Sequence, residues 1–167
     1  MLAYLCGPIE FADAHGKLWR RKLTPFLQEH LGHQVYDPAE DEKKNLTQEE
    51  ATHFREWKTA DQERFRRVVR KIIQFDLDLI ENQADYLICY WEDSAGRSGG
   101  TSAEMTGAFR KGIPVYLVTP VPLEQVSGWM LGCADQVFAS VEQLKEFLLA
   151  RYGGGKQAQL CEGETRR

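Results

Sequence analysis

The chain has 167 residues, of which 43% are hydrophobic and 28% charged, and its formal net charge at pH 7 is −4. This length suits one globular domain with its own core, and the acidic balance argues against a nucleic-acid-binding protein. The locally basic segment 64–71 is interpreted as the solvated face of a helix. Neither a secretory leader nor a membrane-spanning apolar run is recognised, so we expect a cytoplasmic protein with no membrane partner.

The amino-terminal half alternates strand-like and helix-like segments. The hydrophobic pattern predicts, in chain order, a buried strand at 2–6, a helix at 17–31, a short strand at 34–36 and a long helix at 61–82. Pro25 predicts a kink or a break in the first of these helices. Residues 39–60 are polar and are interpreted as an insertion. A short helix is expected within it, because Thr47 and Glu50 have the spacing of a capping box.

The carboxyl-terminal half continues the same alternation. It predicts a central strand at 85–91, a Gly- and Ser-rich loop at 92–101, a helix at 102–111, a strand at 113–118, a weaker strand at 136–139 and a helix at 141–151. Residues 153–167 are glycine-rich and polar, and we expect them to form a disordered tail. The expected domain therefore covers residues 1–152.

Strands that alternate with helices predict one doubly wound α/β domain, in which helices cover both faces of a parallel sheet. Five strands favour the flavodoxin-like order. In such sheets the ligand lies beyond the carboxyl ends of the strands, which here gathers segments 7–11, 91–101 and 119–122. Candidate functional residues are therefore sought in these three segments and in the helix that begins at 102.

Glu104 is the sharpest candidate for chemistry. It is predicted to lie in the first turn of a helix, directly after the Gly-rich loop, where free amide groups and the positive helix end favour a charged carboxylate. A carboxylate that stays ionised in a partly enclosed site can act as a nucleophile. The alternative is a helix-stabilising charge with no further role.

Asp76 is the second candidate. The helical repeat places it on the apolar stripe of the long helix, whereas Asp78 is turned about 200° away, toward solvent. An ionisable group on a buried stripe needs a partner or a role. The pattern alone leaves open whether Asp76 is a paired core residue or part of a site.

Signatures of metal and cofactor sites are missing. The sequence has no P-loop and no dinucleotide-binding fingerprint. Cys6, Cys89, Cys133 and Cys161 lack ligand spacing and are expected to be free thiols, three of them buried, in a reducing compartment. The four histidines are scattered in polar surroundings and are interpreted as surface residues. We therefore expect neither a metal nor a cofactor.

Over most of residues 2–150, except 39–60, the chain resembles the nucleoside 2-deoxyribosyltransferase-like family. The resemblance rests on the order and spacing of the segments Tyr4–Ile9, Asp76–Ile80, Asp85–Ile88, Gly100–Ala108 and Gly112–Val118. The family contains transferases that exchange bases on deoxyribose and hydrolases that cleave the N-glycosidic bond of nucleoside monophosphates. A nucleoside or a nucleotide is thus the expected small-molecule partner.

The resemblance implies roles for individual residues. Glu104 matches the nucleophile that forms a covalent glycosyl ester, and Asp76 matches an aspartate that helps to handle the leaving base. The turn Gly7, Pro8 and Ile9 matches a loop that lines the sugar and base pocket. Tyr4 lies just before this turn and is also expected to bind substrate.

One position departs from the transferases. Where they carry a base-contacting aspartate, this chain has Ser98, and a hydroxyl cannot replace a carboxylate. In the family's nucleotide hydrolases a serine in this region recognises phosphate, so Ser98, Gly100, Thr101 and Ser102 are expected to bind substrate here. A nucleotide hydrolase stays open, as does a non-catalytic nucleotide-binding or sensing domain.

The resemblance also implies a homodimer or a higher homo-oligomer, in which a neighbouring subunit completes the pocket. Trp57, Trp129 and Met130 are candidate interface residues, and burial in the core is the alternative for each.

Overall fold

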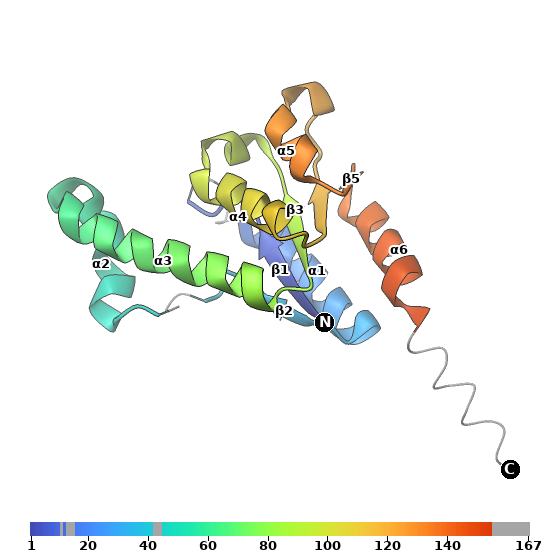
Figure 1. The fold of residues 1–167 in the computed structure, drawn as a ribbon, viewed down its shortest axis with the longest axis horizontal. Coiled ribbons are helices and arrows are strands. Elements are labelled where there is room, and N and C mark those ends of the chain that lie inside the picture. The colour runs from blue at the N-terminus through green and yellow to red at the C-terminus, as the bar shows by residue number, and fades with distance from the viewer. Residues whose placement is uncertain (11, 13–15, 42–44, 155–167) are drawn as a thin grey trace, which may run out of the picture.

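The computed structural model describes residues 1–10, 12, 16–41 and 45–154. Its centre is a parallel five-stranded sheet with the order β2-β1-β3-β4-β5 (Figure 1). The strands are β1 (Leu2–Cys6), β2 (Gln34–Tyr36), β3 (Tyr86–Tyr90), β4 (Val115–Val118) and β5 (Gln136–Phe138). This order confirms the predicted flavodoxin-like α/β fold.

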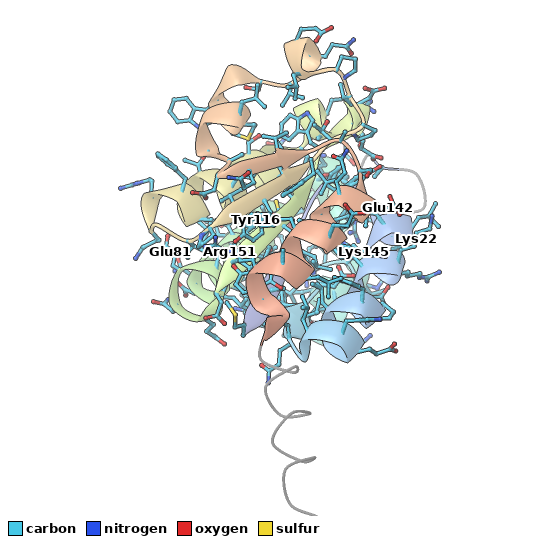
Figure 2. All side chains as sticks on the ribbon, turned by 90° about the vertical axis from the view of Figure 1, so that its right-hand side faces the viewer. Lys22, Glu81, Tyr116, Glu142, Lys145 and Arg151 are labelled. Atoms are coloured by element: carbon cyan, nitrogen blue, oxygen red, sulfur yellow. The ribbon has the colours of Figure 1, made fainter. Side chains whose placement is uncertain are left out.

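Helices cover both faces of the sheet, as predicted. They are α1 (Lys17–Leu31), α2 (Gln48–Ala60), α3 (Gln62–Gln83), α4 (Gly99–Arg110), α5 (Gly128–Cys133) and α6 (Val141–Tyr152), with short 3-10 turns at η2 (Asp93–Arg97) and η3 (Leu123–Gln125). α1 and α6 lie on one face, and α3, α4 and α5 on the other. Figure 2 views the molecule from the side of α6 and shows Glu142 and Lys145 of α6 along its border with α1, where Lys22 lies.

The central strands are buried on both faces, which explains their continuous apolar sequence. Successive side chains of a strand point to opposite faces, and β1 divides accordingly. Tyr4 and Cys6 pack toward α3 and α4, whereas Ala3 and Leu5 pack toward α1 and α6. This alternation decides which residues of β1 can meet α4.

Segment 39–60 contains a helix that packs on α3, and together α2 and α3 extend beyond the sheet (Figure 1). The predicted capping box is confirmed: Thr47 Oγ1 accepts from the Glu50 amide at 3.2 Å, and Glu50 Oε2 accepts from the Thr47 amide at 2.9 Å. No residue of α2 is buried. The guanidinium of Arg64 lies 3.7 Å above the ring of Trp57, so a charged side chain covers this aromatic residue.

Two helices differ from the sequence prediction. α1 runs unbroken through Pro25, so the possible break is wrong. Leu23, Phe26 and Leu27 are buried on both sides of the proline, and this burial stabilises helix on either side of it. α4 begins at Gly99 rather than at 102, because Ser98 caps the helix and two exposed glycines form its first turn.

Two further expectations about burial are wrong. His33 is buried, in contrast to its predicted place on the surface, because its ring packs between Tyr86 and Tyr152. The helical repeat over 61–82 predicts that Ile73 belongs to the apolar stripe of this helix, but Ile73 is 50% exposed. Exposure varies along the stripe, since Val68, nearer the amino terminus of α3, is only 1% exposed.

Some expectations fall at the margins of the described chain. His15, Cys161 and most of the tail predicted at 153–167 lie outside the described residues. Cys6, Cys89 and Cys133 are free and buried, which confirms the prediction for these three. In the part of the chain that the structure describes, no helix combines the length and the apolar character needed to cross a membrane.

Candidate active site

Tyr4 and Glu104, one hundred positions apart, meet between the sheet and α4. The hydroxyl of the buried Tyr4 donates a hydrogen bond to Glu104 Oε1 at 3.0 Å. The thiol of Cys6, two residues along β1, faces the carbonyl of Thr101 at 3.6 Å. These contacts dock the start of α4 onto β1 and turn Glu104 toward the sheet.

Asp76 reaches the same place from α3. It is only 7% exposed, whereas Asp78 is exposed, as the helical repeat predicts. Burial raises the pKa of Tyr4 well above its ordinary value, and the negative charges of Glu104 and Asp76 raise it further. Tyr4 therefore keeps its proton at neutral pH and remains a hydrogen-bond donor beside two carboxylates.

Tyr36 and Asp41 are partners that the sequence interpretation missed. The ring of Tyr36 lies 5.3 Å from that of Tyr4, and its hydroxyl donates to Asp41 Oδ2 at 3.1 Å. Burial raises the pKa of Tyr36, followed by the charges of Asp76, Asp41 and Glu104. Strand pairing could have suggested Tyr36, because β1 and β2 are neighbouring parallel strands and Tyr36 lies directly opposite Tyr4 in their register.

These five residues form a group that we call the tyrosine–carboxylate cluster, composed of Tyr4, Tyr36, Asp41, Asp76 and Glu104. It combines two phenolic donors, from β1 and β2, with three acidic side chains, from α3, α4 and the turn after β2. Such a set can orient a carboxylate nucleophile and form hydrogen bonds to a polar substrate.

The position of Glu104 in its helix differs from the prediction. Because α4 begins at Gly99, Glu104 is the sixth helical residue and lies in the second turn. The effect of free amides and of the helix end fades within the first turn, so it does not account for a charged Glu104. The partner that the structure gives the Glu104 carboxylate is instead the Tyr4 hydroxyl, which donates a hydrogen bond to it.

Ser98 and Thr101 form the cap of α4. Ser98 Oγ accepts from the Thr101 amide at 3.4 Å and lies 2.9 Å from Thr101 Oγ1. Thr101 is buried, whereas Gly99 and Gly100 are exposed. The first-turn amides of the two glycines have no partner within the helix, as at any helix start. The structure thus places Ser98 and Gly100 at an exposed helix end and Thr101 beneath it.

Ser102 lies apart from Glu104. Two residues along a helix correspond to a turn of about 200°, so the two side chains leave α4 on different sides. Ser102 lines an outer groove of about 550 Å³ between α3 and α4, together with residues that include Leu77, Thr106 and Arg110. The structure does not bring Ser102 into the tyrosine–carboxylate cluster.

Gly7, Pro8 and Ile9 follow β1 at the carboxyl edge of the sheet. Gly7 and Pro8 are buried, and Ile9 is partly exposed. The carbonyl of Gly7 accepts a hydrogen bond from Arg20 at 3.0 Å, and a Cβ at Gly7 would lie 3.0 Å from the Tyr90 carbonyl. The turn is therefore closely packed against α1 and β3, next to the cluster along β1.

Within residues 1–10, 12, 16–41 and 45–154, no group of three or more His, Cys, Asp or Glu side chains is arranged to hold a metal ion.

The candidate interface residues have different surroundings. Trp129 is 68% exposed, and its indole N–H donates to Thr106 Oγ1 at 3.0 Å. Met130 is buried in the core with α4 and β4, and Trp57 is partly covered by Arg64. Of the three, Trp129 alone presents a largely exposed side chain.

Comparisons with known proteins support the fold and give no information on the activity. No family model matches the chain, and a search of curated proteins gives no match. The solved structure of a conserved protein from Enterococcus faecalis V583 is similar, with a TM-score of 0.58 and 17% sequence identity. The match covers 90% of this chain and 98% of that one, so the two proteins share the fold over nearly their whole lengths.

Proposed function

We propose that the protein cleaves or transfers the N-glycosidic bond of a nucleoside or nucleoside monophosphate, with Glu104 as the covalent nucleophile. The observation that carries this proposal is the hydrogen bond from the buried Tyr4 hydroxyl to Glu104 Oε1, 3.0 Å long, beside the buried Asp76. A hydrogen bond from a phenol fixes the orientation of a carboxylate, and an oriented carboxylate can act as a nucleophile.

In the first step, a Glu104 oxygen attacks the anomeric carbon of the sugar. The bond between this carbon and the base nitrogen breaks, its electron pair leaves with the base, and the base takes up a proton from water. An ester between the sugar and Glu104 remains. Positive charge builds on the sugar ring in the transition state, and the carboxylates of Glu104 and Asp76 stabilise it electrostatically.

In the second step, water or an acceptor base attacks the same carbon and the ester bond breaks. Glu104 leaves as a carboxylate, and the incoming group loses one proton to water. Tyr4 serves both steps, because its high pKa keeps it a neutral donor that orients Glu104. Asp76 faces the cluster from α3, which fits a role in handling the leaving base.

A phosphate group on the substrate would find its partners at the start of α4. Ser98 and the exposed first-turn amides of Gly99 and Gly100 suit an anion, and the exposed Arg97 adds a positive charge nearby. We propose that this end of α4 distinguishes monophosphates from nucleosides.

We further propose that the protein works as a homo-oligomer in the reducing cytoplasm. Ile73, Phe109 and Trp129 are each at least half exposed on α3, α4 and α5, the helices on the Glu104 side of the sheet. A second copy that covers these side chains would also enclose the outer side of α4. The free thiols of the described chain fit the compartment.

The direct experiment incubates the protein with deoxynucleosides, ribonucleosides and their monophosphates, with and without acceptor bases, and measures free base by chromatography. We expect base release, and a loss of at least about 10³-fold in Glu104→Ala. Glu124→Ala, on the exposed turn η3, is the matched control and should keep full activity.

Two outcomes would contradict the proposal. Full activity in Glu104→Ala would exclude Glu104 as the nucleophile. Melting temperatures that rise with nucleotide while no base is released would favour a non-catalytic nucleotide-binding domain instead.

A further inference from the structure

Arg20 is a fully enclosed positive charge outside the cluster. Its side chain leaves α1 and is 1% exposed. Nη2 donates to the Gly7 carbonyl at 3.0 Å, Nη1 donates to the Gly16 carbonyl at 2.8 Å, and Nε forms an ion pair with Asp37 Oδ1 at 3.1 Å. One guanidinium thus joins the turn after β1, the start of α1 and the turn after β2.

The turn after β1 fits closely around this guanidinium. Gly16 has a φ of 64°, and a Cβ there would lie 2.3 Å from the Pro8 carbonyl oxygen and 2.7 Å from Arg20 Nη1. No other residue type fits this position without movement of the backbone. Gly7, Pro8 and Gly16 therefore pack as one body with Arg20.

The turn after β2 is organised by the partner of Arg20. Asp37 Oδ1 also accepts from the Ala39 amide at 2.8 Å, and the Asp37 carbonyl accepts from the Glu40 and Asp41 amides at 3.1 and 3.2 Å. This turn ends at Asp41, whose carboxylate accepts a hydrogen bond from the Tyr36 hydroxyl. The residue that meets Arg20 therefore also places one member of the tyrosine–carboxylate cluster.

The geometry calls for arginine rather than for any positive charge. The Arg20 guanidinium donates to two carbonyls from Nη1 and Nη2 and forms an ion pair with Asp37 on a third side, where Nε makes no hydrogen bond. An ammonium on a flexible stem cannot hold this arrangement. The fork is further confined because Arg20 lies 4.5 Å above the Trp19 ring, which itself stacks on Tyr90 at 5.3 Å. Its partners fix both the position and the plane of the guanidinium.

We infer that Arg20 is a positioning residue that locks the turn after β1 and the turn after β2 into one unit flanking the tyrosine–carboxylate cluster. Its effect on catalysis rests on the proposed function, whereas the coupling of the two turns does not. Arg20 does not touch the reacting atoms. It acts through Gly7 on one side and through Asp37 on the other.

The test uses Arg20→Lys, Asp37→Asn and, as a control, Arg21→Lys at the exposed neighbouring position of α1. Hydrogen exchange by mass spectrometry follows peptides that cover residues 5–10, 34–41 and 99–110. We expect Arg20→Lys to accelerate exchange in the first two segments together, at least about tenfold, and to leave α4 unchanged. Asp37→Asn should loosen the same two segments, and Arg21→Lys neither.

If hydrogen exchange in Arg20→Lys is faster in only one of the segments 5–10 and 34–41, or in neither, Arg20 does not couple the two turns. If Arg20→Lys fails to fold by circular dichroism, Asp37→Asn decides by the same criterion. In the activity arm, Arg20→Lys should lower kcat per folded molecule about tenfold. An unchanged kcat with lower stability would mean that Arg20 is merely structural. If the wild-type protein releases no base, the proposed function fails, and the exchange data alone decide the coupling.

Discussion

Tyrosines gather in two regions on opposite faces of the same sheet. Toward α3 and α4, Tyr4 and Tyr36 donate their hydroxyl protons to the carboxylates of Glu104 and Asp41. Toward α1 and α6, three other tyrosines meet one another and a buried histidine: Tyr86, Tyr116, Tyr152 and His33. We call this second set the tyrosine–histidine group.

The two regions share a residue type and differ in the partners of the hydroxyls. Tyr116 and Tyr152 share a hydrogen bond of 2.7 Å, and Tyr86 shares one of 2.8 Å with His33 Nδ1. The Tyr152 hydroxyl also accepts from Arg151 Nε at 3.2 Å, and the group packs between α6 and the sheet (Tyr116 is labelled in Figure 2). We propose that the chemistry is carried by the carboxylates that Tyr4 and Tyr36 contact, and not by the phenols themselves.

The largest predicted contrast comes from removing one hydroxyl in each region. Tyr4→Phe should lower kcat for base release by roughly 100-fold, because Glu104 loses the donor that orients it. Tyr116→Phe should leave kcat unchanged and lower the free energy of unfolding by about 1 kcal/mol, since the hydrogen bond between Tyr116 and Tyr152 is lost. Steady-state kinetics and urea unfolding measure the two effects on the same proteins.

An equal loss of kcat in both variants would break the comparison. So would a Tyr4→Phe variant that is destabilised but retains full activity per folded molecule.

The fold was predictable because its signals are local and repeated. Continuous apolar strands, intervening helices and glycine stops together predict the parallel sheet and its order. Asp76 was placed on the buried stripe of α3 by periodicity alone, and the capping box at Thr47 by the residue type at each position. Each of these follows from neighbours in the chain.

The site was predictable only in part, because its contacts are long-range. Glu104 and Asp76 were singled out, and a family resemblance added the neighbouring Tyr4, but no local pattern pairs Tyr36 with Asp41. The start of α4 was misplaced because two glycines argue against helix, whereas the Ser98 cap and the packing of Cys6 on Thr101 favour it. The burial of Arg20 follows from three carbonyl and carboxylate partners that sequence alone does not bring together.

A smaller effect is predicted at the end of α4, between the substrate classes. Ser98→Ala should reduce kcat/KM about tenfold more for monophosphates than for nucleosides, since one hydrogen bond to a charged group is worth about 1.5–3 kcal/mol. Loss of the cap should also lower the free energy of unfolding by about 1 kcal/mol. Equal effects on both substrate classes would exclude the phosphate role of Ser98 while leaving that of Glu104 untouched.

The smallest predicted effect distinguishes the tyrosine–histidine group by its response to pH. Burial lowers the pKa of His33, followed by the charge of the nearby amino terminus. The unfolded chain, with a histidine pKa of about 6.5, then binds more protons than the folded one, so His33 makes stability fall as the pH drops below that value.

The expected slope from His33 stays below about 1.4 kcal/mol per pH unit, the limit for one proton. Urea unfolding between pH 7.5 and 5 should show a shallower decline in His33→Gln than in wild type. His53→Gln, at an exposed position, is the control. If stability declined equally in His33→Gln and in wild type, the pKa of this histidine would not differ between the folded and the unfolded chain.

The central claim is that a sugar becomes covalently attached to Glu104. A 2-deoxy-2-fluoro arabinosyl nucleoside, and its 5′-monophosphate, should form an ester that is hydrolysed slowly, because fluorine destabilises the positively charged transition state. Peptide mass spectrometry of the trapped protein should find the sugar mass on Glu104, with none in Glu104→Gln. A sugar adduct on another carboxylate, such as Asp41 or Asp76, would contradict the account.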